Sequence, residues 1–132
     1  MNRRDFIQTI LAALGGSAVV KPAQAQPIPL RLLLLETPLA GFQFYSGAGV
    51  FSQLQPGDPL RLARDHENRY DPNAVELHWR ERLLGYLPSK NNVVIAQMMD
   101  RGETVSANIV TLRQSVNPWD RVGLEVWWVE QG

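Results

Sequence analysis

Residues 67–75 read Glu-Asn-Arg-Tyr-Asp-Pro-Asn-Ala-Val, and ten residues later residues 85–88 read Gly-Tyr-Leu-Pro. Asp, Asn and Pro in the first stretch favour a turn, because Pro fixes φ and the short polar side chains bond to the nearby backbone. From Ala74 to Trp79 apolar and polar residues alternate, as in a half-buried strand. The two stretches therefore predict a turn that gathers planar and hydrogen-bonding side chains at the entrance to a hairpin.

Period-two patterns and turn signals recur on either side of this turn. They predict strands over residues 30–36, 60–64, 74–79, 83–87, 105–112 and 121–129. The Leu-rich strand at 30–36 is expected to be mostly buried, and the aromatic segment 41–47 to form another strand or its turn. One or two helical turns are expected over 48–54. The clearest helix is expected to begin at a Ser89 cap, to show Val94, Ile95, Met98 and Met99 at helical spacing, and to stop at Gly102.

These elements predict a mainly β domain. Its expected form is a small curved sheet or β-barrel of a modified oligonucleotide-binding (OB) type, with about six strands and one or two helices. The chain contains no cysteine, which excludes disulfides, thiolate zinc sites and a cysteine nucleophile. Apolar residues make up 45% of it, which suits a compact small domain better than a disordered chain.

The first 25 residues resemble a bacterial export signal of the twin-arginine type. Arg3 and Arg4 precede an apolar run over residues 7–20, and Ala23-Gln24-Ala25 forms an Ala-x-Ala site with cleavage expected after Ala25. An N-terminal amphipathic helix or membrane anchor is the alternative, but the run of about 14 residues is shorter than the roughly 20 that span a bilayer. We therefore predict a signal at 1–25, a lead segment at 26–29, and one domain at 30–132 that is periplasmic or exported and has no stable membrane span.

Charge on the expected mature protein differs from charge on the whole chain. The whole chain carries 13 Lys and Arg against 13 Asp and Glu, and losing Arg3, Arg4, Lys21 and Asp5 leaves 10 against 12. A broad electrostatic grip on nucleic acid needs many phosphate-neutralising cations, so a slightly acidic domain argues against one. A small binding pocket is compatible with this charge.

No pattern in the sequence supports catalysis or a metal. Asp65, His66, Glu67, Asp71 and His78 lack the spacing of a helical zinc site and the central glycine of a calcium loop, which favours a solvated charged loop. No serine lies in a nucleophile elbow, and neither histidine is placed as its base. We therefore predict a non-enzymatic binding module with no catalytic residue, no metal and no cofactor.

Three stretches carry a resemblance to a known family. Residues 60–64, 67–75 and 84–88, followed by a helix, resemble the HIRAN domain, a module found in Swi/Snf-type fork-remodelling translocases and as free-standing bacterial proteins. The similarity extends over roughly residues 30–130. It implies a modified OB barrel that binds the 3′ end of single-stranded DNA, with aromatic side chains stacked on the terminal bases and an aspartate at the free 3′ hydroxyl.

The resemblance also implies which residues would bind. Phe44, Tyr45 and Tyr70 match stacking aromatics, Asp71 matches the hydroxyl acceptor and Asn68 a polar contact. Stacking is tolerant of sequence because every base has a π-face, and an acidic acceptor would repel a 3′ phosphate. The expected ligand-binding set is Phe44, Tyr45, Asn68, Tyr70, Asp71, Tyr86 and Lys90.

This chain departs from the family pattern at several cationic positions. Gln43 stands where DNA-binding members have an arginine, Ser89 where many relatives have a basic residue, and Tyr86 where some have a histidine. Lys90, one residue further on, is a candidate replacement cation. Fewer cations predict weak DNA affinity.

Each candidate also has a structural interpretation. Residues 71–73 would serve equally to build a turn, and Tyr70 and Tyr86 could be core aromatics with satisfied hydroxyls. If Phe44 and Tyr45 lie on a strand, one of them must face inward. The DNA-end hypothesis requires Tyr70 to be accessible. The alternative is an exported envelope protein that uses the same pocket for another ligand or a protein partner.

Overall fold

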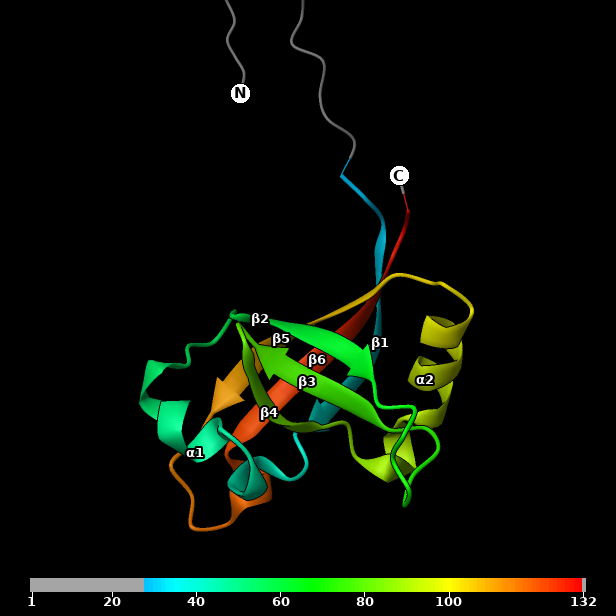
Figure 1. The fold of residues 1–132 in the computed structure, drawn as a ribbon. Coiled ribbons are helices and arrows are strands. Elements are labelled where there is room, and N and C mark those ends of the chain that lie inside the picture. The colour runs from blue at the N-terminus through cyan, green and yellow to red at the C-terminus, as the bar shows by residue number, and fades with distance from the viewer. Residues whose placement is uncertain (1–27, 132) are drawn as a thin grey trace, which may run out of the picture.

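The computed structural model describes residues 28–131, so the export signal predicted over 1–25 lies outside the described residues. Six antiparallel strands form one sheet in the order β1-β6-β5-β2-β3-β4 (Figure 1). Two α-helices and several 3-10 turns complete the domain. The elements are β1 (Arg31–Pro38), α1 (Gly47–Val50), β2 (Pro59–Arg64), β3 (Val75–Trp79), β4 (Arg82–Tyr86), α2 (Val93–Asp100), β5 (Val105–Leu112) and β6 (Val122–Val129).

Strand β2 is the corner at which the sheet folds over on itself. Its first residues, Pro59 and Leu60, pair with β5, whereas Arg61 to Arg64 pair with β3. The edge strands β1 and β4 do not form a ladder with each other, so the barrel stays open. A single bridge joins the two edges, in which Ala40 and Tyr86 exchange two N–H to C=O bonds of 2.9 Å. The prediction of a mainly β, curved sheet related to the OB fold is confirmed.

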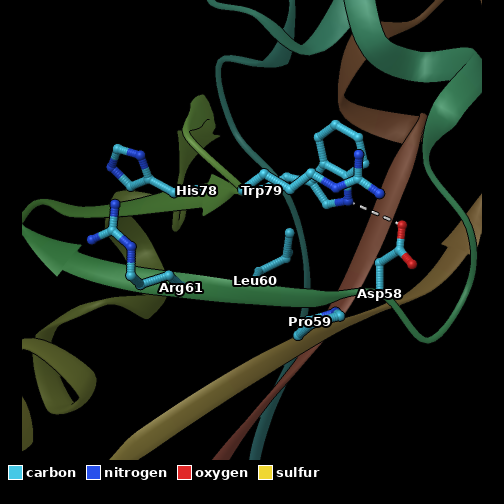
Figure 2. A pocket seen from close by; sticks show the side chains of 7 residues that line it. Asp58, Pro59, Leu60, Arg61, His78 and Trp79 are labelled. Carbon is cyan, nitrogen blue, oxygen red and sulfur yellow. Dashed lines mark hydrogen bonds between the residues drawn. The ribbon is translucent and has the colours of Figure 1, made fainter.

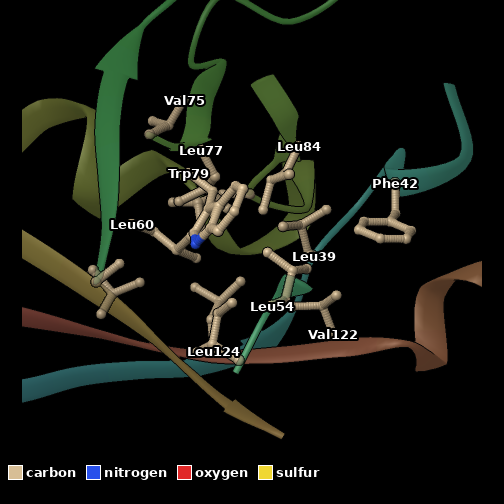
Figure 3. Packing of buried hydrophobic residues seen from close by; sticks show 14 of the residues in the cluster. Leu39, Phe42, Leu54, Leu60, Val75, Leu77, Trp79, Leu84, Val122 and Leu124 are labelled. Atoms are coloured by element: carbon tan, nitrogen blue, oxygen red, sulfur yellow. The ribbon is translucent and has the colours of Figure 1, made fainter. Parts of the chain in front are cut away.

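The core lies inside this fold of the sheet. Val75, Leu77 and Trp79 of β3 are buried, while the intervening Glu76 and His78 face the other side. This alternation is the one that the sequence predicts for residues 74–79. Figure 3 shows these side chains packed against Leu84 of β4 and against Leu124, which β6 contributes from the opposite wall.

Gly85 explains why the motif at 85–88 begins with glycine. A Cβ atom at this position would lie 2.3 Å from the carbonyl oxygen of Ala40 and 2.4 Å from Cδ2 of Leu39. The absence of a side chain therefore lets the segment after β1 approach β4 closely enough to form the bridge with Tyr86.

Residues 41–47 form a turn and no strand. Gly41 adopts a left-handed conformation (φ 77°), which ends the extended segment, and residues Phe42–Phe44 follow as a 3-10 turn. Phe42 points into the core, where its ring lies 5.9 Å from that of Phe51 in an edge-on arrangement. The turn alternative is thus the correct one, and the helical turns expected over 48–54 are present as α1 and the 3-10 turn Phe51–Gln53.

The prediction that the first strand is mostly buried is wrong. Leu32 and Leu33 of β1 are about half exposed, and only Thr37 near its end is buried. The reason is the position of β1 at the sheet edge, where its first half pairs only with the last residues of β6 in a ribbon that projects from the domain (Figure 1). The leucine content of a segment shows that it is hydrophobic, but it does not show how many strands lie beside it and bury it.

Helix α2 begins later than the sequence predicts. Ser89 does not cap it, because residues Ser89–Asn91 form a separate 3-10 turn and Asn92 occupies the cap position. Val94 is exposed, while Ile95 and Ala96 face the core. The predicted stop is confirmed, since Gly102 has φ 85° and its N–H donates to Met99 O. Within residues 28–131, no helix has the length and apolar character needed to cross a membrane.

Candidate nucleic-acid interface

The turn between β2 and β3 is held by its own polar side chains. Oδ1 of Asn68 accepts the N–H groups of Tyr70 and Asp71, both at 2.9 Å, and Oδ1 of Asp71 accepts the N–H of Asn73 at 2.9 Å. These bonds are the Asx type that the composition of residues 67–75 predicts. They leave the Tyr70 side chain 94% exposed, so the turn presents this ring to solvent instead of packing it into the core.

Asp65 ties the turn to strand β4. Its Oδ2 accepts the Tyr86 hydroxyl at 2.9 Å and Nδ2 of Asn68 at 3.3 Å. Burial and this hydrogen bond raise the pKa of Tyr86 well above the usual tyrosine range. The Tyr86 hydroxyl therefore remains a donor to Asp65 and orients the two motifs relative to each other. The sequence presented Asp65 only as a weak metal candidate.

Tyr45 lies beside Tyr86, and Phe44 precedes it in the chain. The rings of Tyr45 and Tyr86 are 5.6 Å apart between centroids and inclined by 54°. Phe44, one residue earlier in the 3-10 turn, is 74% exposed. Because these residues belong to a turn and not to a strand, neither is forced inward, and Phe42 supplies the core contact instead. The turn thus leaves both rings accessible.

The carboxylate of Asp71 is held in place by a buried side-chain amide. Asn92 is completely buried, and its Nδ2 donates to Oδ2 of Asp71 at 2.8 Å. A carboxylate offers about four acceptor positions, so the bonds from Asn92 and from the Asn73 N–H leave capacity for another donor. Asn92 is a site residue that the sequence did not reveal, since Asn at the start of a helix is normally explained as a cap.

Arg64 supports the turn from the other side. Its side chain is only 9% exposed and donates to the carbonyl oxygens of Pro72, at 3.0 Å, and of Ala74. The same guanidinium bonds to the carboxylate of Asp100 at the end of α2, with Nε to Oδ1 at 3.0 Å. This bond is the main reason why the pKa of Asp100 is lowered. Arg64 is therefore committed to structure and is not a free cation for a ligand.

The expected ligand-binding residues are in part connected by direct contacts. Tyr45 contacts Tyr86, and Asp65 connects Tyr86 to Asn68, whose side chain holds the backbone of Tyr70 and Asp71. The structure brings these five of the seven into one network.

The other two expected residues lie outside this network. Phe44 adjoins it through the chain alone. Lys90 is exposed in the 3-10 turn two residues before Asn92, and no hydrogen bond or ion pair within residues 28–131 joins it to the other six. Lys90 is therefore near the site in sequence but is not held in place by it.

The acidic residues of the turn do not gather around a cation site. Among residues 28–131, no group of three or more Asp, Glu and His side chains is arranged to hold a metal ion. Asp65 and Asp71 bond to Tyr86 and Asn92, respectively, and His78 lies on β3 with its Nε2 donating to Glu76 at 2.9 Å. These side chains serve as hydrogen-bond partners of the fold.

The comparison with protein families agrees with this architecture. The family model described as the HIRAN domain matches residues 32–130. The chain belongs to the HIRAN domain family. The match contains every element from β1 to β6 apart from the first residue of β1, so the family assignment covers the whole folded unit.

Known proteins similar to this HIRAN domain include one curated relative and two crystal structures. The Fanconi-associated nuclease 1 homolog of Oryza sativa subsp. japonica is 32% identical over 73 residues, which are 52% of this chain and 7% of that protein. This chain therefore spans a small part of the relative's length. A protein from Lactobacillus plantarum superposes with a TM-score of 0.68 at 23% identity, covering 78% of this chain and 99% of that one. The HIRAN domain of human HLTF gives 0.60 at 19% identity, with coverage of 76% and 80%.

Proposed function

We propose that this HIRAN domain is a non-enzymatic module that binds the 3′ ends of single-stranded nucleic acid. The observation that carries the proposal is Tyr70, a fully presented ring on a turn that is fixed by Asn68 and lies next to Asp71. Family membership supports the same ligand class. Stacking requires an accessible π-face, and this turn presents one on a backbone that the Asn68 side chain holds in place.

Tyr70, Tyr45 and Phe44 supply the stacking part of the proposal. Each base stacked on an aromatic side chain contributes about 1 to 3 kcal/mol, so two terminal bases contribute roughly 2 to 6 kcal/mol. With few cations nearby, the dissociation constant for a short strand should be no lower than about 40 µM, the value that corresponds to 6 kcal/mol. Binding should therefore be weak, insensitive to base sequence and limited to single strands.

Asp71 supplies the selectivity for the end. Its remaining acceptor capacity suits a free 3′ hydroxyl, which donates one hydrogen bond. A 3′ phosphate would bring negative charge against the carboxylate and would be rejected. Asn92 holds the carboxylate in place, because its buried amide leaves Asp71 little freedom to turn away.

Fluorescence anisotropy with a short 5′-labelled oligonucleotide tests the proposal. We expect binding at low salt to an oligonucleotide with a free 3′ hydroxyl and a clear loss when the 3′ end is phosphorylated. Tyr70→Phe retains the ring and should bind like the wild type, whereas Tyr70→Leu should bind about tenfold more weakly. Because the side chain is exposed, neither change should alter stability by more than about 0.5 kcal/mol. Absence of binding, or equal binding of both ends, would overturn the proposal.

We further propose that the domain is exported after cleavage at Ala25. The support is the pattern of residues 1–25, with Arg3 and Arg4 ahead of the apolar run and the Ala-x-Ala site. Intact mass measurement of the protein recovered from a periplasmic extract should give an N-terminus at Gln26. Exchange of both arginines for lysine should retain the uncleaved chain in the cytoplasm, and an uncleaved exported chain would contradict the assigned site.

A further inference from the structure

A hollow of about 530 Å³ lies at the opposite end of β2 and β3 from the Tyr70 turn. It forms where β2 leaves β5 to pair with β3, and its walls include Arg61, His78 and Arg80. Figure 2 shows Arg61 and His78 side by side on neighbouring strands, with Trp79 and Asp58 further along. None of the ligand-binding residues expected from the family lines this hollow.

The cations of this hollow are available to a ligand. Arg61 and Arg80 are both exposed, and neither forms an ion pair within residues 28–131. One carboxylate lines the hollow, that of Asp58, and its Oδ2 already accepts Nε1 of Trp79 at 3.1 Å and the N–H of Gln55 at 2.9 Å. Arg61 and Arg80 thus bring two positive charges to the hollow against the single negative charge of Asp58, and this balance favours an anion.

Arg80 is held in a defined place. Its guanidinium lies over the Trp79 ring, 4.3 Å from the ring centroid, and a cation–π contact of this kind leaves the N–H edges free. Those edges have the fork geometry that matches two oxygens of a phosphate. The chemistry of the hollow therefore selects a phosphate monoester or diester group over a neutral ligand.

Strand geometry relates the hollow to the Tyr70 turn. Residues 65–74 connect β2 to β3, so the hollow and the turn lie at opposite ends of the same strand pair. Arg61 pairs with His78, and Glu76 pairs with Tyr86, all on the face turned away from the core. At about 3.3 Å per residue, β3 alone is roughly 13 Å long, and Tyr70 and Asp71 lie beyond its end in the turn. A stacked strand advances about 3.4 Å per nucleotide, so a stacked strand needs at least about four nucleotides to reach from the turn to the hollow.

We infer that the hollow binds a backbone phosphate of the same nucleic-acid strand whose 3′ end lies at Tyr70 and Asp71. The inference rests on the proposed function. The strand crosses the outer face of β3 from the turn toward Arg61, with its 5′ side at the hollow, where Arg80 lies just beyond the end of β3. An acidic domain then needs only two well-placed cations to extend its interface beyond the terminal bases. A site of at least about four nucleotides lies within the range for OB folds, about 4 to 16.

Length dependence of binding tests the inference separately from the proposed function. A thymidine dinucleotide reaches only the turn, whereas an octanucleotide also reaches the hollow, and both carry a free 3′ hydroxyl. At about 20 mM salt we expect the wild type to bind the octanucleotide at least tenfold more tightly. The double variant Arg61→Gln/Arg80→Gln should lose this gain and keep its affinity for the dinucleotide. The logarithmic slope of its salt dependence should also decrease by about 0.7, the change expected when one phosphate of a single strand is no longer neutralised.

Arg113→Gln is the matched control, because Arg113 is an exposed arginine beyond the end of β5 and outside the hollow. It should leave the length dependence unchanged. Equal binding of the two oligonucleotides by the wild type would overturn the inference and leave the proposed function intact, as would a double variant that retains the full gain. Failure of the dinucleotide to bind, by contrast, would remove the proposed function itself. Thermal unfolding of each variant shows whether its fold is preserved. The comparison of the two oligonucleotides on the wild-type protein does not depend on any variant.

Discussion

Replacement of Gly85 by alanine tests how the two edges of the sheet are held together. The new Cβ would lie 2.3 Å from Ala40 O, whereas ordinary van der Waals contact begins at 3.4 Å. The two segments must therefore separate by about 1.1 Å, or the backbone must distort by a similar amount. Leu39 can adjust its side chain, but the Ala40 carbonyl is backbone and is held by the Tyr86 N–H.

The cost has two parts. Overpacking in a close-packed interior typically costs about 1 to 3 kcal/mol. The separation also weakens both Ala40–Tyr86 hydrogen bonds, each of which contributes about 0.5 to 1.5 kcal/mol net. We expect a total loss of about 2 to 5 kcal/mol in the free energy of unfolding, a large part of the roughly 5 to 15 kcal/mol that stabilises a domain.

Urea unfolding followed by tryptophan fluorescence measures this loss, since the chain contains four tryptophans. The midpoint for Gly85→Ala should fall by about 1 to 3 M. Gly49→Ala is the matched control, because nothing lies within 4 Å of a Cβ at that position and its backbone is helical. It should leave stability unchanged or raise it by up to about 1 kcal/mol. A Gly85→Ala midpoint within about 0.3 M of the wild type would show that the edges have room to part and would refute the reasoning.

Three further predictions concern the support of the Tyr70 turn. Arg64→Met should reduce stability by about 2 to 4 kcal/mol, because it removes charged donors from the Pro72 and Ala74 carbonyls, and Arg61→Met on the same strand should have little effect in the same urea assay. The lowered pKa of Asp100 means that its pairing with Arg64 stabilises the fold above the ordinary aspartate pKa, and this stabilisation is lost as the pH falls through the folded value. The small stability difference between the wild type and Asp100→Asn should therefore be present at pH 7 and lost at an acid pH below the folded pKa of Asp100. An unchanged difference at both pH values would contradict this assignment. Asn92→Ala should lower the free energy of unfolding by about 1 to 3 kcal/mol. Because Asp71 loses the bond from Asn92, the variant should also discriminate less between a free and a phosphorylated 3′ end in the anisotropy assay. Discrimination equal to that of the wild type would show that other contacts position Asp71.

The turn at residues 67–75 is the part of the site that sequence predicts best. Asn68, Asp71 and Pro72 form a local structure through bonds that span two or three residues, so composition alone is sufficient to anticipate it. The same holds for the alternation in β3, where each side chain faces the core or solvent according to the period of the strand.

Prediction from sequence fails where distant segments decide the outcome. Residues 41–47 have the composition of a strand, but Phe42 is drawn into a core formed by residues far along the chain, and Gly41 turns the backbone to allow it. The leucines of β1 predict burial, yet the strand lies at the sheet edge with one neighbour. Asn92 is not recognisable as a site residue because its partner, Asp71, is 21 residues away in sequence.

The amino-acid sequence alone is enough to establish the mainly β class, the turn before β3 and the residue types suited to stacking, because each follows from local backbone preferences or from the period of a strand. The folded chain adds that Tyr70 is exposed while Phe42 is buried, and that Asp65 joins Tyr86 to Asn68.

In the folded chain the Arg64 guanidinium is bonded to the turn and to Asp100, whereas Arg61 and Arg80 form no ion pair within the described part of the chain. Exposure and ion pairing depend on which remote segments pack against a side chain. The segments that pack against these arginines come together only when β2 pairs with β5 at its start and with β3 further on. No local sequence pattern can therefore predict which arginines are paired.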